Sequence, residues 1–156
     1  MDYTMPKYEK SILSPDKVHF FYYDVMRNLE DNSIFLYDWN HDIQAYLDNK
    51  NIVIEAKEKD VLPTTIEKDK LHFTIREQDE NNKAVAFFNH LRNAFAHLRI
   101  VPEGEYLNIT DGSWKGKEKD KHFERTMIGQ IKYEDLKELC FLFFKQRDKF
   151  IEENNI

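Results

Sequence analysis

The fold is predicted first from residues 82–102, which read NKAVAFFNHLRNAFAHLRIVP. Apolar residues recur in this stretch every three or four positions, at Val85, Phe88, Leu91, Phe95 and Leu98. This spacing predicts an amphipathic helix over about residues 82–98, because such positions lie on one side of a helix. A polar, capping-type cluster at 79–82 precedes the helix, and Pro102 with Gly104 ends the region.

Three other segments also predict amphipathic helices. Ser14, Pro15 and Asp16 form a helix start: a capping hydroxyl, a proline at the first position and an acid near the positive end of the dipole. The apolar residues that follow at helical spacing are Val18, Phe21, Tyr22, Val25, Met26 and Leu29. The second of these predicted helices has its apolar residues at Leu36, Trp39, Ile43, Tyr46 and Leu47. The third, within residues 133–153, has them at Leu136, Leu139, Cys140, Phe143, Phe150 and Ile151.

Short β-type runs separate these helices. Residues 52–54 and 71–75 lie in a charged region that we interpret as a loop with one or two strands. Residues 106–111 and 123–131 predict two further strands, with Asp111 and Gly112 as the turn signal between them. The charged residues 115–121 belong to the polar connection of this hairpin.

Together these elements predict a mainly α-helical fold. We expect a bundle of four to five helices, because each amphipathic helix needs cover for its apolar side. A small β element at about residues 100–131 would be inserted before the last helix. No Gly-, Pro- or Ser-rich linker divides the chain, so we expect a single domain over residues 1–156.

Composition narrows the class of protein. The chain of 156 residues has 29 acidic and 23 basic residues, a net charge of −6. This charge disfavours a general nucleic-acid coat and a polybasic membrane binder. We expect a cytoplasmic protein without a signal peptide or membrane span, because no apolar run is long enough for either. The single cysteine, Cys140, sits on an apolar stripe and is predicted to be a buried residue.

The acids avoid one part of the chain. From Asn81 to Pro102 a run of 22 residues contains no Asp or Glu. The positive or titratable residues in the same run are Lys83, His90, Arg92, His97 and Arg99. An anion could be held here despite the negative total, because nearby charges dominate within a Debye length of about 8 Å.

Helical geometry divides these residues into two stripes. His90, Asn93 and His97 lie on one stripe, and Arg92 and Arg99 lie on another. The angle from Arg92 to His97 around the axis of a straight helix is roughly 140°. Periodicity alone therefore does not bring these two side chains into one pocket. A long Arg side chain, a distorted helix end or a second copy of the helix could do so.

The string Arg92-Asn93-Ala94-Phe95-Ala96-His97 resembles the motif of HEPN-domain ribonucleases, in which a polar residue commonly follows the Arg and a His completes the motif. It looks especially similar to the small stand-alone HEPN nucleases of bacteria and plasmids. The resemblance implies a helical bundle, a homodimer whose two motifs line one cleft, and RNA cleavage that needs no metal and no cofactor. The four histidines outside the run, His19, His41, His72 and His122, likewise show no metal-ligand spacing.

The resemblance also implies roles for the motif residues. His97 would exchange protons with the ribose 2′-OH and the leaving oxygen, because imidazole titrates near neutral pH. Arg92 would hold the scissile phosphate through bidentate hydrogen bonds, and Asn93 would orient the imidazole or contact the phosphate. His90 and Arg99 are further candidates for substrate binding. The expected product is a 2′,3′-cyclic phosphate.

Several alternatives stay open for the function. The chain could be a toxin or phage-defence effector with an antitoxin protein as partner, a non-catalytic RNA- or nucleotide-binding HEPN domain, or a protein-interaction module. A modifying partner that targets a Tyr two residues after the motif His is not expected, because Arg99 stands there. Residues 115–121 are a solvated hairpin tip or, with Trp114, a contact for RNA or a partner. We expect one focused anion site and few phosphate contacts.

Overall fold

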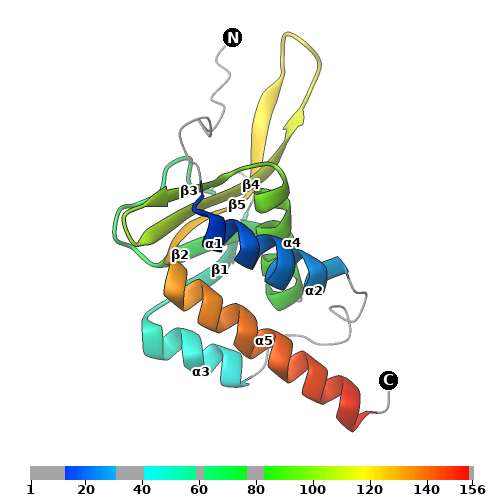
Figure 1. Cartoon of the computed structure of the whole chain (residues 1–156). Coiled ribbons are helices and arrows are strands. Elements are labelled where there is room, and N and C mark those ends of the chain that lie inside the picture. Colours follow the sequence, from blue (N-terminus) through cyan, green and yellow to red (C-terminus); the bar gives the residue numbers. More distant parts are fainter. Residues whose placement is uncertain (1–12, 31–40, 59–61, 77–82, 155–156) are drawn as a thin grey trace.

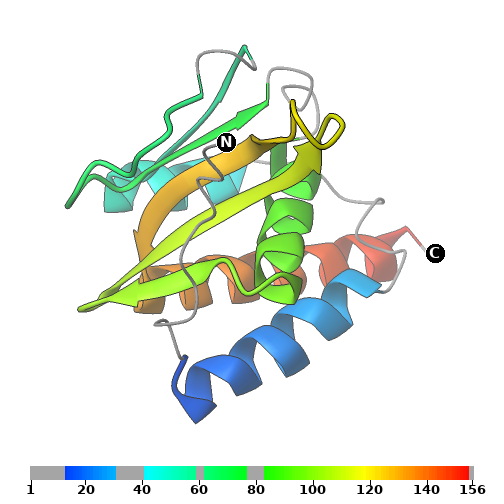
Figure 2. The same ribbon diagram turned by 90° about the horizontal axis from the view of Figure 1, so that it is seen from above.

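The chain folds into a five-stranded sheet with its helices gathered on one face. The computed structural model describes residues 13–30, 41–58, 62–76 and 83–154 (Figure 1). The strands are β1 (Val53–Lys57), β2 (His72–Arg76), β3 (Ile100–Glu103), β4 (Tyr106–Lys115) and β5 (His122–Lys132). The helices are α1 (Pro15–His19), the π-helical η1 (Phe20–Met26), α2 (Arg27–Glu30), α3 (His41–Lys50), α4 (Lys83–Ala96) and α5 (Tyr133–Glu153). Figure 2 shows the two layers.

The predicted helical bundle is wrong, and the structure is an α/β fold. The sheet has the strand order β1-β2-β5-β4-β3. β1 and β2 pair in parallel, and β2 pairs antiparallel with β5, with Phe73 opposite Gly129. The strands at 100–132 are therefore not an insertion into a bundle, because they complete a sheet that begins before α4. Helical periodicity shows which side of each helix is apolar, but it does not show which element packs against that side. In this structure the apolar sides of the helices pack against a sheet.

The strand boundaries correct two local predictions. Residues 100–103, expected to end the helical region, form β3, which pairs with β4. Asp111 and Gly112 do not form the hairpin turn but lie inside β4 at a β-bulge. Asp111 pairs with Met127 and Gly112 with Arg125, so Thr126 is the extra residue. The turn lies nearer Gly116, whose φ of +87° suits a glycine. The strands predicted near 52–54 and 71–75 are confirmed as β1 and β2.

The first helix begins at Pro15 after the N-cap residue Ser14, as predicted, but the Ser14 hydroxyl makes no capping hydrogen bond. The middle of this helical segment is a π-helix. The wider turn changes which residues face the core. Phe20, Phe21 and Val25 are buried in η1. Val18 and Tyr22, expected on the buried stripe, are 42% and 55% exposed. The side chain of Leu29 lies outside the described residues.

The other predicted helices are confirmed over their described parts, except that Leu98, expected on the apolar side of α4, lies beyond its last residue Ala96 and is 67% exposed. Ile43 and Leu47 of α3 are buried, whereas Leu36 and Trp39 lie outside the described residues. The Tyr46 hydroxyl of α3 donates a hydrogen bond to a backbone carbonyl of α5 at 2.9 Å. Of the apolar residues predicted for α5, Leu136, Leu139, Cys140 and Phe143 are buried, and Phe150 and Ile151 are half-buried.

One core lies between the sheet and the helices. The sheet contributes Phe73, Ile75, Leu107, Ile109, Met127 and Ile131, and the helices contribute Phe20, Phe21, Phe87, Phe88, Leu91, Leu136 and Phe143. Aromatic contacts join the layers, with the Phe73 and Phe87 ring centroids 5.1 Å apart. Gly129 of β5 makes room for Phe73, whose ring occupies the place of a Cβ atom there. No helix in the described part of the chain is long and apolar enough to cross a membrane.

Candidate functional site

The α4 helix is anchored to the sheet by a buried carboxylate. Nδ1 of His90 lies 2.7 Å from Oδ2 of Asp111, and the two residues are 5% and 4% exposed. A carboxylate only accepts hydrogen bonds, so the imidazole nitrogen is the donor. The Thr126 hydroxyl donates to the same oxygen at 3.3 Å. The β-bulge provides this second contact, because its extra residue is Thr126.

Asn93 shares the same carboxylate. Its Nδ2 donates to Oδ2 of Asp111 at 3.5 Å, one helical turn after His90. The sequence predicted both His90 and Asn93 as site residues, and the structure brings them together at Asp111. The sequence interpretation missed Asp111 because Asp-Gly was taken as a turn. An available signal was the alternation of Leu107, Ile109 and Asp111, which places the acid on the buried side of the strand.

This anchor changes the electrostatic interpretation of α4. The run of residues 81–102 contains no acid, but a carboxylate from β4 lies directly against its His90 stripe. The part of the stripe formed by His90 and Asn93 is therefore not an open anion site. The positive or titratable side chains left for an external anion at this end of α4 are Arg92 and His97.

His97 stands at the end of α4, on the surface. Its backbone N–H donates to Asn93 O at 3.0 Å, so the helical bonding continues through this residue. The next two N–H groups, of Leu98 and Arg99, donate to Phe95 O and Ala94 O at 3.1 and 2.8 Å. These two bonds, with Leu98 in the left-handed conformation at φ +58°, form a Schellman motif. The motif ends the helix immediately after His97.

Arg92 and His97 lie on different sides of the end of α4. Arg92 is half-buried in the last turns of α4, and His97 is exposed. Because the helical hydrogen bonding runs through His97, the two side chains remain roughly 140° apart around the helix axis. A site that uses both residues at one phosphate therefore needs a second copy of the helix or a large rotation of the Arg side chain.

The Arg99 side chain is not exposed, as a residue that binds a phosphate from solution would be. The residue is buried, and its Nη1 donates to the Gly112 carbonyl at 2.9 Å. Its guanidinium carbon lies 4.6 Å from the centroid of the Phe123 ring. Arg99 thus connects the end of α4 to the base of the β4–β5 hairpin. Binding of RNA by Arg99 stays a prediction.

The remaining candidate groups lie elsewhere. Cys140 is buried as predicted, and its burial raises the pKa of the thiol. His72 Nε2 lies 2.8 Å from Glu55 Oε1. Burial raises the pKa of the Glu55 carboxyl, but a hydrogen bond from Lys57 and the nearby His72 outweigh this effect, so the pKa is lowered.

No three His, Cys, Asp or Glu side chains among the described residues form a metal-binding group. Metal independence stays a prediction.

Comparison with known proteins defines the class of this chain. It is a HEPN-domain protein, as the motif on α4 indicated. It belongs to the HEPN pEK499 p136 family, whose model matches residues 21–156 and so includes every element from α2 to α5 and all of η1 except Phe20. No curated protein and no solved structure matches the chain.

Proposed function

We propose that this chain is an endoribonuclease that cleaves RNA without a metal ion. The observation that carries the proposal is the motif Arg92-Asn93-x3-His97 on α4 of a HEPN-family chain, with His97 exposed at the helix end. An exposed imidazole can reach a ribose and exchange protons near neutral pH. The two candidates for substrate contact at the phosphate are Arg92 and His97.

In the proposed reaction, a neutral His97 takes the proton of the ribose 2′-OH. The 2′-oxygen then attacks the phosphorus, and the bond to the 5′-oxygen breaks. A protonated His97 on a second copy gives its proton to that leaving oxygen. The products are a 2′,3′-cyclic phosphate and a 5′-hydroxyl, so protons and charge balance. The Arg92 guanidinium stabilises the extra charge on the phosphoryl oxygens.

Two copies are part of this proposal because of helix geometry. Arg92 and His97 lie roughly 140° apart on one α4. Two α4 helices that face each other across a two-fold axis could place Arg92 of one copy near His97 of the other. The Asp111 anchor would keep Asn93 and the whole motif helix in a constant position on the sheet. Light scattering should report a homodimer.

The activity is tested by incubating purified protein with RNA and excess chelator. We expect cleavage by the wild-type protein, and a loss of about 100-fold or more for His97→Ala and for Arg92→Ala, as for removal of a general acid–base group. His19→Ala is the matched control, because His19 is an exposed histidine on α1, outside the motif. Cleavage that requires added metal, or equal cleavage by His97→Ala, contradicts the mechanism.

A second candidate is a HEPN domain that binds RNA or nucleotides without cleaving them. It is favoured by Asp111, which already occupies the His90 and Asn93 stripe, and by the net charge of −6. RNA binding without turnover across several RNA types would support it. A role as a toxin or phage-defence effector, with an antitoxin as partner, would appear as growth arrest on expression that is lost in His97→Ala.

A further inference from the structure

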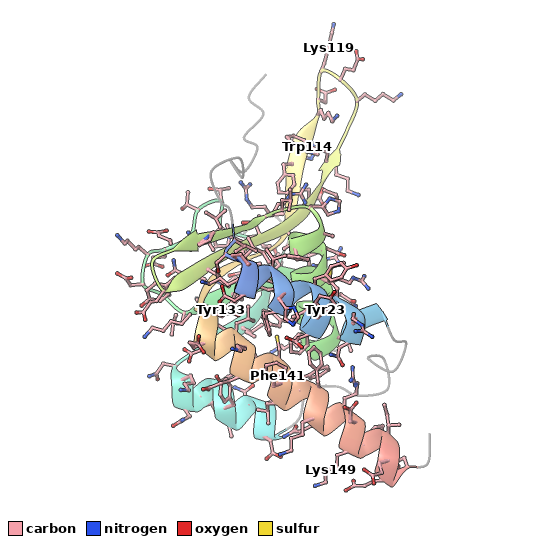
Figure 3. All side chains as sticks on the ribbon, viewed as in Figure 1. Tyr23, Trp114, Lys119, Tyr133, Phe141 and Lys149 are labelled. Carbon is pink, nitrogen blue, oxygen red and sulfur yellow. The ribbon has the colours of Figure 1, made fainter. Side chains whose placement is uncertain are left out.

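The β4–β5 hairpin extends beyond the body of the sheet as an arm. We define the arm as residues 114–123. Figure 1 shows it rising away from the helices, and Figure 3 places Lys119 at its tip and Trp114 nearer the body. All seven residues from 115 to 121 are exposed. The arm is longer than the sheet requires, because β2 ends its pairing with β5 at Met127.

The arm concentrates positive charge on an acidic protein. It carries four lysines, Lys115, Lys117, Lys119 and Lys121, and two acids, Glu118 and Asp120, a net charge of +2. Since the whole chain carries −6, the rest of it carries −8. Salt screens interactions between exposed charges beyond about 8 Å, so a ligand at the arm feels the charges of the arm more strongly than those of the distant parts of the body.

The four arm lysines are not used inside the protein. None of them forms an ion pair with any residue that the structure describes, and Lys121 only approaches the Trp114 ring, at 5.9 Å. Several lysines of the body behave differently and pair with nearby carboxylates: Lys50, Lys57, Lys70, Lys132 and Lys149. The charge of the arm is therefore available to an external anion.

The base of the arm is braced by stacked side chains. The Trp114 and Phe123 rings meet edge to face, with centroids 5.5 Å apart. The guanidinium carbons of Arg99 and Arg125 lie 4.6 and 5.6 Å from the Phe123 centroid. Gly112 allows this packing, because a side chain there would collide with the Phe123 ring. A braced arm loses less conformational entropy on binding than a free loop.

The brace also connects the arm to the motif helix. Arg99, which donates to the Gly112 carbonyl at 2.9 Å, follows His97 by two residues. The arm therefore begins beside the end of α4. A polyanion held along the arm would approach the part of the protein where His97 is exposed.

We propose that the arm binds the sugar–phosphate backbone of the RNA substrate. This inference rests on the proposed function for the identity of the ligand. Lysines at every second position, 115 to 121, provide four separate point charges, each suited to one phosphate. Trp114 adds an aromatic ring beside Lys121, and aromatic rings are a common part of surfaces that bind single nucleic-acid strands. Such a surface suits a nucleic-acid strand better than an acidic protein segment, which offers no planar bases.

The size of the arm limits the number of phosphate contacts to about four. Each phosphate contact to a single strand contributes a slope of about −0.7 to the dependence of log affinity on log salt. The arm should therefore contribute a slope of up to about −3. This agrees with a protein that makes few contacts with its substrate.

The test measures binding of a fluorescent single-stranded RNA by anisotropy at several salt concentrations. All proteins carry His97→Ala, so that the RNA stays intact. The arm variant changes Lys115, Lys117, Lys119 and Lys121 to Gln. The control variant changes four exposed lysines of the body, Lys57, Lys68, Lys145 and Lys149, to Gln. Both variants lose four positive charges, and two of the control lysines, Lys57 and Lys149, also lose an ion pair with a nearby carboxylate.

We expect the arm variant to bind about tenfold more weakly and its salt slope to be smaller by about 3, with little change in the control variant. A second variant, Glu118→Gln with Asp120→Asn, should bind several-fold more tightly. Equal affinity of the arm and control variants overturns the inference, as does equal competition by polyglutamate. Because anisotropy does not depend on cleavage, a wild-type protein that fails to cleave RNA contradicts only the proposed function.

Discussion

At the scale of single residues, Asp111 determines how the motif helix sits. Its carboxylate receives hydrogen bonds from His90 and Asn93 of α4 and from Thr126 of β5. A buried polar group that loses its partner costs far more than an exposed one, because no water replaces the bond. The position of α4 on the sheet therefore depends on one acid that lies outside the motif.

Asp111→Asn tests this anchor with almost no change of shape. The amide keeps one acceptor oxygen but loses the negative charge that strengthens the bonds to its three neighbours. We expect the free energy of unfolding to fall by about 1–3 kcal/mol, measured by urea denaturation. Asp120→Asn, on the exposed arm, should leave unfolding unchanged. A midpoint for Asp111→Asn that equals the wild-type value contradicts the role of the carboxylate.

At the scale of elements, the end of α4 places the strained residue Leu98 next to His97, the proposed acid–base residue. Leu98 is in the left-handed conformation, which a branched L-residue adopts at a cost of about 1–2 kcal/mol. Its side chain is 67% exposed, so packing does not compensate for this strain. The strain is maintained by the two Schellman hydrogen bonds, and it ends the helix immediately after His97.

Leu98→Gly should therefore raise the free energy of unfolding by up to about 1 kcal/mol, since Gly tolerates a positive φ and little apolar contact is lost. The matched control is Ala45→Gly at an exposed position inside α3, where the same residue should lower stability by about 1 kcal/mol. Thermal or urea unfolding of both variants checks the opposite signs. Similar destabilisation by the two glycines would show that Leu98 is not strained.

At the scale of the whole molecule, sheet and helices share one core. Buried residues of η1, α3, α4 and α5 and of all five strands belong to the same hydrophobic cluster. Arg147 of α5 adds a polar connection, because its Nη2 donates to Asn28 Oδ1 of α2 at 2.7 Å. Neither layer can lose its partner without exposing this core.

We therefore expect the described layers to unfold together. Transitions in urea followed by far-UV circular dichroism and by near-UV aromatic signals should coincide. The arm variant should have the same midpoint, because its lysines lie outside the core. Two separated transitions would contradict the single domain predicted for residues 1–156.

Local features of the chain were predictable without coordinates. The helix from Tyr133 to Glu153, the strands near 52–54 and 71–75, and the burial of Cys140 all follow from short-range periodicity. The motif of Arg92 and His97 likewise identified the HEPN family, because it depends on residue types at fixed spacing on one helix. These features concern neighbours in the chain, whose relations the sequence contains directly.

The tertiary structure decided the rest. The pairing of β2 with β5 turned an expected bundle into an α/β fold, since strand partners far apart in the chain leave no local pattern. The π-helical turn of η1 exposed Tyr22, and the bulge in β5 brought Thr126 and Asp111 to His90. By itself the sequence determined most of the helices and strands, and the motif. Which surfaces meet depended on packing between distant segments, where burial and hydrogen bonding must be satisfied together.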